Sequence, residues 1–178
     1  MRLSSPPLLL AALLGLSQCQ KSDPGPADQL PPATQTGANT FGCLVNGQVW
    51  TPRGYNGTSN YSIVYDSNLN NGNFDLMSYR YPDASNNLQS IALNILSNAS
   101  LGSHSFQNNY NTQSGFNNTK TNCYWSSRDS ATTYRRGNLT ITRLDLKAGI
   151  ISGTFDFTLY RPGCDSVRVT QGRFDKKL

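Results

Sequence analysis

From Gly37 onward, apolar residues recur at every second position, and this period constrains the fold more than any other feature of the sequence. Residues 90–95 and 150–159 show it most clearly, because Ile, Leu and Phe alternate there with smaller or polar residues. A period of two belongs to a β-strand with one buried face, whereas a helix repeats every 3.6 residues. Asn-Gly pairs, at 46–47 and 71–72 among other places, supply the positive φ angles of tight hairpin turns. The sequence therefore predicts strands joined by turns.

The predicted strands are short and turn residues separate them, which is typical of an all-β protein. The pattern fits two architectures: a single antiparallel β-sandwich or a lipocalin-like closed barrel. All ten acidic residues are Asp and nineteen residues are Asn, a composition that disfavours helical bundles. Residues 98–120 are expected to form a long polar loop. The expected strands are 41–46, 48–51, 61–66, 73–81, 88–96, 122–127, 132–136, 138–146, 149–160 and 166–175.

The alternation also predicts which side chains form the core. It slips in phase twice, once between residues 141 and 144 and once between 169 and 174, across Gly172. Bulges or bends are expected at both places, because an extra residue returns the apolar positions to the buried face. The predicted inward residues are Val45, Trp50, Ile63, Leu76, Leu93, Ile95, Leu139, Ile141, Ile151, Phe155, Phe157, Leu159, Val167, Val169 and Phe174.

The N-terminus has the features of an export signal. Arg2 is followed by the apolar run 8–14 and then by small residues close to Cys19. A short basic start, an apolar run of this length and small residues near a cleavage point are typical of a secretory signal peptide. Cys19 stands where a bacterial lipoprotein carries its lipidated cysteine, although Gln18 departs from the usual small residue before it. We expect a signal peptide at 1–18 and fatty chains, palmitate among them, on Cys19.

Lipidation predicts both the location and the domain organisation. Several acyl chains on one residue anchor a protein durably in a membrane, and Asp23 is compatible with sorting to the outer membrane. Residues 19–36 contain four Pro and are expected to form a flexible linker in which nothing packs. A single β-domain at 37–178 would follow, facing the periplasm or the cell surface.

Three cysteines remain once Cys19 is assigned to lipid. In an exported protein, one disulfide and one buried thiol is the natural arrangement, and three pairings satisfy it. We favour Cys123–Cys164, which would join the start of a predicted strand to the turn 161–164. Cys43 would then lie in the first strand as a small apolar residue. The sequence has no C-x-x-C motif and one histidine, His104, so no metal site is expected.

Positive charge is concentrated in the second half of the chain. Residues 120–178 carry eleven Lys and Arg against five Asp. We favour solvated outward positions of strands for these arginines; the alternative is that they attract anionic glycolipids or an acidic polysaccharide. Nucleic acid is not an expected partner, because an exported, lipid-anchored protein does not meet it. The arginines are Arg128, Arg135, Arg136, Arg143, Arg161, Arg168 and Arg173.

No motif for catalysis is present, so no catalytic residue and no cofactor is expected. The sequence has neither a G-x-S-x-G motif nor a phosphate-binding glycine loop, and His104 is expected to be a solvated loop residue. Residues 66–72 resemble a calcium loop but lack the bidentate Glu, so a plain hairpin turn is expected there. The rings of the Tyr and Trp residues either stack on sugars or stabilise the sheet, and we favour the structural role. These rings are Tyr79, Tyr81, Tyr124, Trp125 and Tyr134.

Two stretches of the sequence are similar to a known family. NTFGCLVNG at 39–47, with WTP at 50–52, resembles the start of small Gram-negative lipoproteins that share a domain of unknown function. The segments 139–145, 150–155 and 172–175 are similar to the end of that family. The resemblance covers roughly residues 37–176, least well over 55–120. It implies a lipid-anchored all-β protein and brings no catalytic residue or ligand.

Two short motifs look like sites of a bacterial modification. Asp-Ser followed by a small or aliphatic residue, centred on Ser130 and Ser166, looks like the O-glycosylation sites of some bacteria that have such lipoproteins.

The sequence thus favours a non-catalytic envelope lipoprotein whose β-domain binds or scaffolds an unknown envelope protein or glycan. One alternative is a lipocalin-like carrier of a small lipophilic molecule, which needs a barrel with an apolar lumen. Another is a hydrolase, which needs several carboxylates in one cleft. Its candidates are Asp75, Asp83, Asp129 and Asp156.

Overall fold

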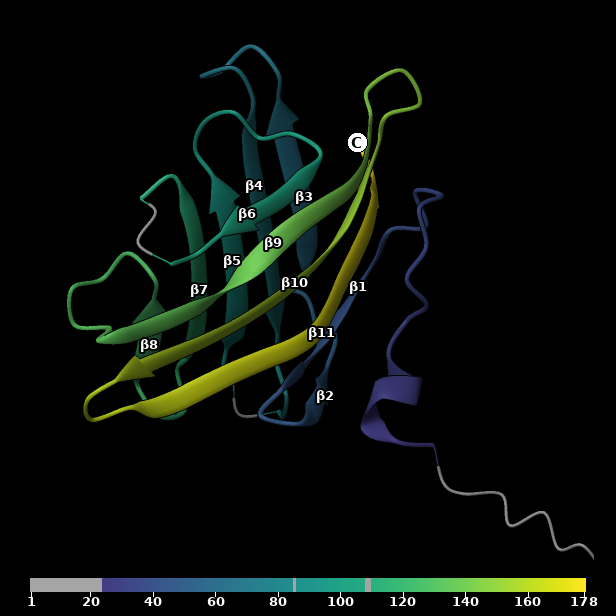
Figure 1. Cartoon of the computed structure of the whole chain (residues 1–178). Coiled ribbons are helices and arrows are strands. Elements are labelled where there is room, and N and C mark those ends of the chain that lie inside the picture. The colour runs from purple at the N-terminus through teal and green to yellow at the C-terminus, as the bar shows by residue number, and fades with distance from the viewer. Residues whose placement is uncertain (1–23, 85, 108–109) are drawn as a thin grey trace, which may run out of the picture.

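The alternating segments pair into two antiparallel β-sheets that pack face to face, as the computed structural model shows for residues 24–84, 86–107 and 110–178 (Figure 1). The six-stranded sheet has the order β2 (Gln48–Trp50), β1 (Thr40–Val45), β11 (Asp165–Lys177), β10 (Ile150–Arg161), β9 (Tyr134–Asp145) and β6 (Gly102–Ser105). The five-stranded sheet has the order β3 (Tyr61–Asp66), β4 (Asn73–Arg80), β5 (Gln89–Ile95), β7 (Thr112–Asn118) and β8 (Cys123–Ser126).

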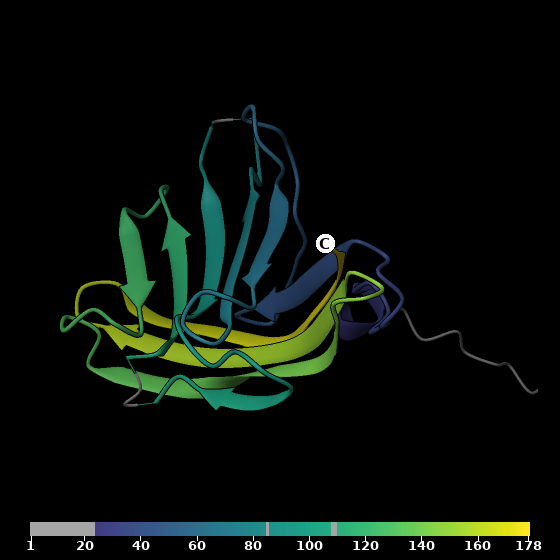
Figure 2. The ribbon, with the colours of Figure 1, turned by 90° about the horizontal axis from the view of Figure 1, so that it is seen from above.

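The architecture is a β-sandwich, which confirms the first of the two expected forms. The strands of the two sheets cross steeply and the six-stranded sheet curves around the other (Figure 2). The described residues do not close into a barrel, so the alternative fold is wrong. A short 3-10 helix, η1 (Pro26–Gln29), precedes the sheets. Across the described part of the chain, no helix has the length and apolar character needed to span a bilayer.

The expected loop at 98–120 is wrong, because it contains two strands. β6 forms an edge of the six-stranded sheet, and β7 lies between β5 and β8 in the other. The inward positions of β7 are Thr112, Ser114 and Phe116, of which two are polar. A strand whose buried face carries hydroxyls shows no apolar alternation, which is why periodicity missed it. The two expected strands at 132–136 and 138–146 are one continuous strand, β9.

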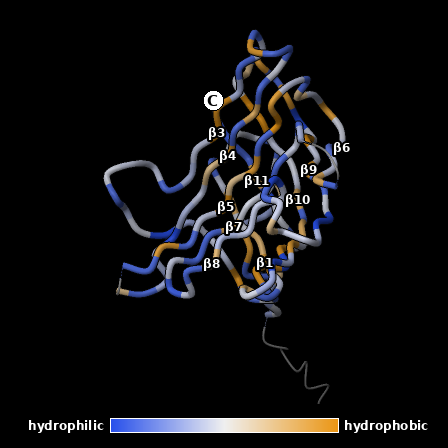
Figure 3. Tube along the Cα trace, turned by 90° about the vertical axis from the view of Figure 1, so that its left-hand side faces the viewer, coloured by the Kyte–Doolittle hydropathy of each residue, from blue (hydrophilic) through white to orange (hydrophobic). Residues whose placement is uncertain are grey.

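The core lies between the sheets, where the predicted inward residues meet. All of them are buried except Val45, which is half-buried and packs against the rest. Aromatic side chains that the alternation did not single out complete this core. Figure 3 shows hydrophobic positions along the strands and hydrophilic ones in the surrounding loops. The additional core rings are Phe41, Tyr61, Phe74, Phe106, Phe116 and Trp125.

Both predicted phase slips are bulges. β9 takes one extra residue between Ile141 and Arg143 opposite β10, and β11 takes one between Val169 and Gly172. Gln171, inside the second bulge, has a φ of 56°. Each bulge returns apolar residues to the buried face, so the broken alternation in the sequence is a feature of the strands themselves.

Reciprocal Gly–Phe pairs join β10 to β11. Gly153 lies opposite Phe174, and Gly172 lies opposite Phe155. A Cβ at Gly153 would stand 2.5 Å from the Phe174 ring, and a Cβ at Gly172 would stand 2.6 Å from the Phe155 ring. Each ring therefore lies over the glycine of the neighbouring strand, where a side chain would exclude it.

Residues 30–38, which we call the N-terminal strap, lie against the six-stranded sheet. Leu30 is buried, and Pro31 occupies the space above Gly42, where a Cβ would come within 2.7 Å of its ring. The Asp175 carboxylate accepts bonds from the backbone N–H of residues 36, 37 and 38 at 2.8–3.1 Å. The expectation that nothing packs in the linker is therefore wrong for residues 30–36. Buried carboxylates need donors, and the strap supplies them. Residues 19–23, Cys19 among them, lie outside the described residues.

Candidate functional site

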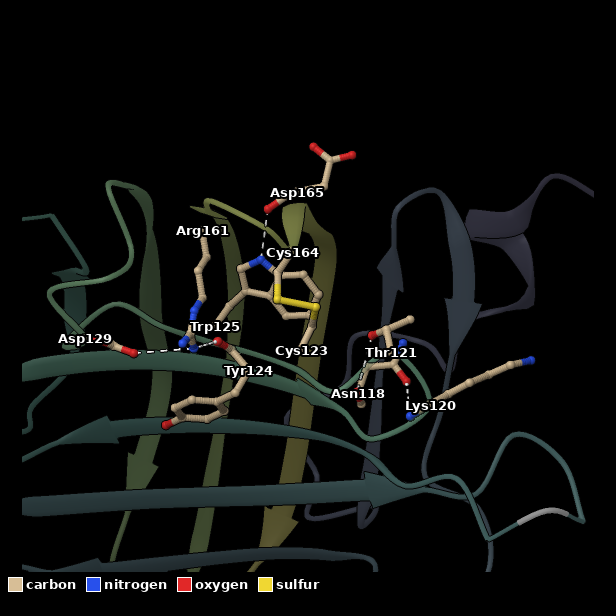
Figure 4. Close-up of a disulfide and its surroundings, with 10 residues drawn as sticks. All are labelled: Asn118, Lys120, Thr121, Cys123, Tyr124, Trp125, Asp129, Arg161, Cys164 and Asp165. Carbon is tan, nitrogen blue, oxygen red and sulfur yellow. Dashed lines mark hydrogen bonds and ion pairs between the residues drawn. A yellow bond between two sulfur atoms is a disulfide. The ribbon is translucent and has the colours of Figure 1, made fainter.

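The predicted disulfide between Cys123 and Cys164 is present. Cys123 begins β8 of the five-stranded sheet, and Cys164 lies in the turn between β10 and β11 of the other sheet (Figure 4). Their Cα atoms are 5.6 Å apart, and 41 positions separate them in the sequence. The bond therefore links the two sheets at one end of the sandwich. Cys43 is a buried free thiol in β1, as expected, and burial raises its pKa far above the ordinary value.

Two further contacts join the sheets beside the disulfide. The indole Nε1 of Trp125 donates to the backbone oxygen of Asp165 at 3.0 Å. The Arg161 guanidinium donates to the backbone oxygen of Tyr124 at 2.7 Å and lies 3.5 Å from the Asp129 carboxylate (Figure 4). Covalent and polar links together fix this end of the molecule.

Both predicted O-glycosylation residues are exposed. Ser130 lies in the turn between β8 and β9, and Ser166 lies near the start of β11. Their exposure is compatible with modification, which stays a prediction. The predicted lipidation residue, Cys19, is outside the described part of the chain.

The carboxylates named for a hydrolase do not converge. Asp75 faces outward from β4 in one sheet, whereas Asp156 faces outward from β10 in the other. Asp129 pairs with Arg161, and Asp83 lies in the segment after β4. His104 lies in β6 rather than in a loop, and its Nε2 is 2.8 Å from the backbone oxygen of Ser100. The described residues therefore offer no cleft in which these groups could act together.

The interior holds no lumen for a carried molecule, because side chains fill it. The Phe41 ring lies 5.7 Å from Trp50 and 5.3 Å from Phe155, and Phe74 lies 5.8 Å from Phe174. Such separations are those of rings in direct contact. The lipocalin-like carrier therefore loses its structural basis in the described residues.

Most of the expected aromatic surface is structural. Tyr79 is buried, and its hydroxyl oxygen lies 2.7 Å from Asn56 Oδ1 and 2.7 Å from the Thr58 backbone oxygen, one of which accepts its proton. Trp125 is buried as well, whereas Tyr124 and Tyr134 are exposed. Residues 66–73 form a hairpin turn, in which the Asp66 carboxylate accepts the backbone N–H groups of Asn68 and Leu69.

The arginines differ in whether their side chains have a partner. Arg135 donates to backbone oxygens, Arg143 pairs with Asp145 at 2.8 Å, and Arg161 pairs with Asp129. The bond from Arg143 holds the pKa of Asp145 below its usual value. Arg136 and Arg168 project from the outer face of the six-stranded sheet, and their side chains make no ion pair or hydrogen bond with the described residues. Arg128 is also exposed without a side-chain bond to the described residues, but it lies in the turn between β8 and β9 and not on this face.

Strand register arranges the outer face of β9, β10 and β11 into rows. Arg136, Thr158 and Arg168 form one row, with the two arginines on either side of the threonine. Asn138 and Asp156 form the next row, beside the bulge of β11. Since neighbouring strands lie about 4.8 Å apart, the backbones of the two arginines are separated by about 10 Å.

A third row continues the polar face. It consists of Thr140, Thr154 and Arg173. Arg173 donates to oxygens of Gln171 and Pro31, so the strap helps to hold it. The three rows carry hydroxyl, amide and guanidinium groups around one carboxylate.

Two adjoining depressions lie over these rows. One, of about 520 Å³, is lined by Arg136, Thr158 and Arg168 among others, and a second, of about 380 Å³, reaches Arg173 and Ala33 of the strap. Asn138 and Asp156 line both. We call this surface the arginine groove. It is shallow, polar and elongated, with three positive charges and one negative charge.

The arginine groove can bind a chain of hydroxyl groups that carries negative charge. Arg136 and Arg168 can each donate two parallel bonds to a carboxylate or phosphate, while Asn138, Asp156 and the threonines can bond to hydroxyls. The sequence pattern pointed to these arginines, but it did not indicate that Asn138, Thr158 and the bulge of β11 lie beside them. Alternation identified the outward positions, but only strand register brings them together.

Comparisons with known proteins add one finding. A family model described as Domain of unknown function (DUF6252) matches residues 82–176. The match includes the closing segments that resembled such a family and does not reach the opening segment at 39–52. No curated protein and no solved structure matches the chain.

Proposed function

The chain belongs to the family described as Domain of unknown function (DUF6252), which names no activity, and from this premise we propose a function on the geometry of the described residues. The protein is a lipid-anchored lipoprotein of the outer membrane, and its β-domain is a non-catalytic binding module. Its ligand is an acidic glycan of the cell envelope, held in the arginine groove.

The observation that supports this ligand is the row formed by Arg136, Thr158 and Arg168. Two guanidinium groups without a partner among the described residues stand on either side of a hydroxyl, beside Asn138 and Asp156. The arginines that are paired elsewhere gain structural contacts, whereas these two gain none from the described residues. Arginine suits planar anionic groups, and the neighbouring amide and hydroxyls suit a sugar.

The anchor and the strap support a ligand close to the membrane. If Cys19 carries lipid, the chain between it and Pro31 is about twelve residues, which span at most about 40 Å when fully extended. The strap forms one wall of the arginine groove through Ala33. A tether this short keeps the groove within reach of glycans attached to the same membrane.

The ligand is tested with the full chain in neutral-lipid vesicles. We expect polygalacturonic acid to bind to these vesicles in a co-sedimentation assay and uncharged dextran not to bind. The binding should weaken steeply as salt rises from about 50 to 500 mM, because salt screens exposed charges. The double variant Arg136→Gln/Arg168→Gln is expected to bind about tenfold more weakly, a loss of about 1.4 kcal/mol.

The matched control removes two exposed charges from elsewhere. Lys120→Gln/Arg53→Gln lowers the net charge equally and touches neither β9 nor β11, so its binding should equal that of the unaltered chain. Equal loss in both double variants would show that only net charge matters and would remove the arginine groove from the proposal.

The anchor is tested by mass spectrometry of protein purified from its own host. We expect the N-terminal peptide to begin at Cys19 and to carry the mass of a diacylglyceryl group with at least one further fatty chain. An unmodified thiol at Cys19, or an intact peptide 1–18, would exclude the anchor.

A further inference from the structure

A half-buried arginine lacks a counter-charge. Arg80 ends β4, and no Asp of the described residues lies within ion-pair distance of it. Burial lowers its pKa, but a guanidinium stays charged at neutral pH. A charge withdrawn from water is costly unless another charge and hydrogen bonds compensate it. The described residues supply hydrogen bonds to the Arg80 guanidinium but no negative charge beside it.

Arg80 is held in place by neutral groups. Its Cζ lies 5.3 Å from the centroid of the Trp50 ring, its Nη1 donates to the backbone oxygen of Val49 at 2.9 Å, and its Nε donates to Oε1 of Gln89 at 2.8 Å. The Trp50 indole donates to the same Gln89 oxygen at 3.1 Å. These contacts hold the guanidinium in place, and its Nη2 has no neighbour of opposite charge among the described residues.

Arg80 lines a small pocket where the two sheets open to solvent. Asn46 and Gln48 come from the β1–β2 hairpin of one sheet, and Gln89 and Asn118 come from β5 and β7 of the other. The pocket has a volume of about 270 Å³, room for about nine water molecules at ~30 Å³ each. The apolar part of its lining is Val45, Phe116, Trp125 and Val167.

The amide groups in this pocket have donors to spare. The oxygens of Gln89, Asn46 and Asn118 accept bonds from Trp50 and Arg80, from the backbone N–H of Arg168 and from that of Lys120. These bonds fix the orientation of each amide. Their NH₂ groups have no bond to the described residues. The lining therefore combines a positive charge with unused N–H donors, and the oxygens of these three amides already accept bonds.

We propose that this pocket binds a small organic carboxylate, with the carboxylate on Arg80 and the amide donors and the rest of the molecule against Phe116 and Trp125. A carboxylate fits the planar guanidinium and supplies the missing negative charge. The edges of the two otherwise buried rings, whose centroids are 5.9 Å apart, form a small apolar part of the lining that an organic acid could contact and a bare inorganic anion would not. The site is separate from the arginine groove, which lies on the outer face of the six-stranded sheet and shares no lining residue with it.

The chain has two tryptophans, and both adjoin this site, Trp50 under Arg80 and Trp125 in the wall. Their two indole N–H signals in a ¹⁵N spectrum of the full chain therefore report on it directly. We titrate acetate, benzoate and glucuronate at constant ionic strength against chloride, with glucose as the uncharged control. We expect saturable shifts of both signals with benzoate or glucuronate, weaker ones with acetate, and none with glucose.

Two variants test the assignment. The second is needed because Arg80→Gln also removes a contact of Trp50 and could shift the Trp50 signal without any change in binding. Arg80→Gln and Asn118→Phe, which fills the pocket and keeps the charge, should each weaken binding at least tenfold, whereas Lys120→Gln should bind as the unaltered chain does. No saturable shift with any of the three acids, or equal binding by Asn118→Phe, would overturn the proposal. Tighter binding of inorganic phosphate than of every acid would overturn the carboxylate. Arg136→Gln/Arg168→Gln should leave these shifts unchanged, so the two proposals fail separately.

Discussion

Asp175 is the residue on which the N-terminal strap depends. Its buried carboxylate accepts bonds from the backbone N–H groups of residues 36–38 and from the hydroxyls of Thr34 and Ser152, the latter two at 2.6 and 2.7 Å. Burial alone would raise its pKa, but these donors outweigh burial and hold the pKa well below the usual value. An ionised carboxylate is therefore part of the folded structure.

Replacing Asp175 by Asn should free the strap. An amide has one acceptor oxygen and cannot receive all of these bonds, so we expect Asp175→Asn to lower the free energy of unfolding by about 2–4 kcal/mol. Urea unfolding measures this, and hydrogen exchange should show the amides of residues 36–38 unprotected. Asp156→Asn, at an exposed position, is the matched control and should change little. Retained protection at 36–38 in Asp175→Asn would contradict this role.

Stability should also depend on pH through Asp175. Because its folded pKa lies below the unfolded value of about 3.9, the unfolded chain binds a proton first as the pH falls. The contribution is complete above about pH 5 and is lost progressively below pH 4, by up to about 1.4 kcal/mol per pH unit. The free energy of unfolding, measured from pH 6 to pH 2.5, should fall less steeply in Asp175→Asn than in the unaltered chain. Identical slopes would mean that another group titrates.

The abundance of asparagine also has a cause at the residue scale. Most of the non-glycine residues with positive φ among the described residues are Asn, including Asn46, Asn71 and Asn98 with φ of 50–60°. Asn tolerates the left-handed region better than most side chains, and it can bond to its own backbone in turns. The composition thus reflects the many turns of an antiparallel fold.

At the scale of elements, the Gly–Phe pairs set how closely β10 and β11 lie against the core. A Cβ at Gly153 would stand 2.2 Å from the backbone oxygen of Thr140, besides meeting the Phe174 ring. Neither the neighbouring backbone nor a packed ring can move away cheaply. These glycines relate the motif ISGTF at 151–155 to the motif GRFD at 172–175. Each motif supplies the glycine that lies under the phenylalanine of the other.

Gly153→Ala should therefore destabilise the sheet strongly. We expect the free energy of unfolding to fall by about 2–4 kcal/mol, because overpacking displaces a ring or a strand. Gly25→Ala is the control, since its Cβ would meet one flexible side-chain atom at 3.5 Å. Chemical denaturation compares the two, and equal midpoints would show that the sheet relaxes around the added methyl.

At the scale of the whole molecule, the disulfide is the one covalent link between the sheets of the described residues. It closes a loop of about forty residues, which in the chain-entropy estimate stabilises the fold by about 4 kcal/mol. Cys123→Ala/Cys164→Ala should lose about this amount in guanidinium unfolding. A reducing agent should lower the midpoint of the unaltered chain and leave that of the double variant unchanged. A response of the double variant to reductant would point to a disulfide formed by one of the remaining cysteines, Cys19 or Cys43.

The sequence alone predicted every strand except β6 and β7, the buried face of most strands and both bulges, and it favoured the correct disulfide among three possible pairings. Each of these is recorded locally, because a side chain's face follows from its position along a strand. The sequence did not predict β7, because its inward residues Thr112 and Ser114 are polar and their neighbours in β5 supply the apolar surface. The sequence did not predict that the strap packs against the sheet, because its proline-rich sequence does not indicate the Asp175 carboxylate that holds it.

Only the tertiary structure decided between sandwich and barrel, and only it assembled the two candidate sites. Arg136, Asn138 and Arg168 lie on two strands whose register depends on a bulge. Arg80 ends β4 and Trp125 lies in β8, 45 positions later in the sequence, and only the fold places both in the lining of one pocket. Long-range pairing places such groups together, and no local period in the chain encodes which distant strand becomes the neighbour.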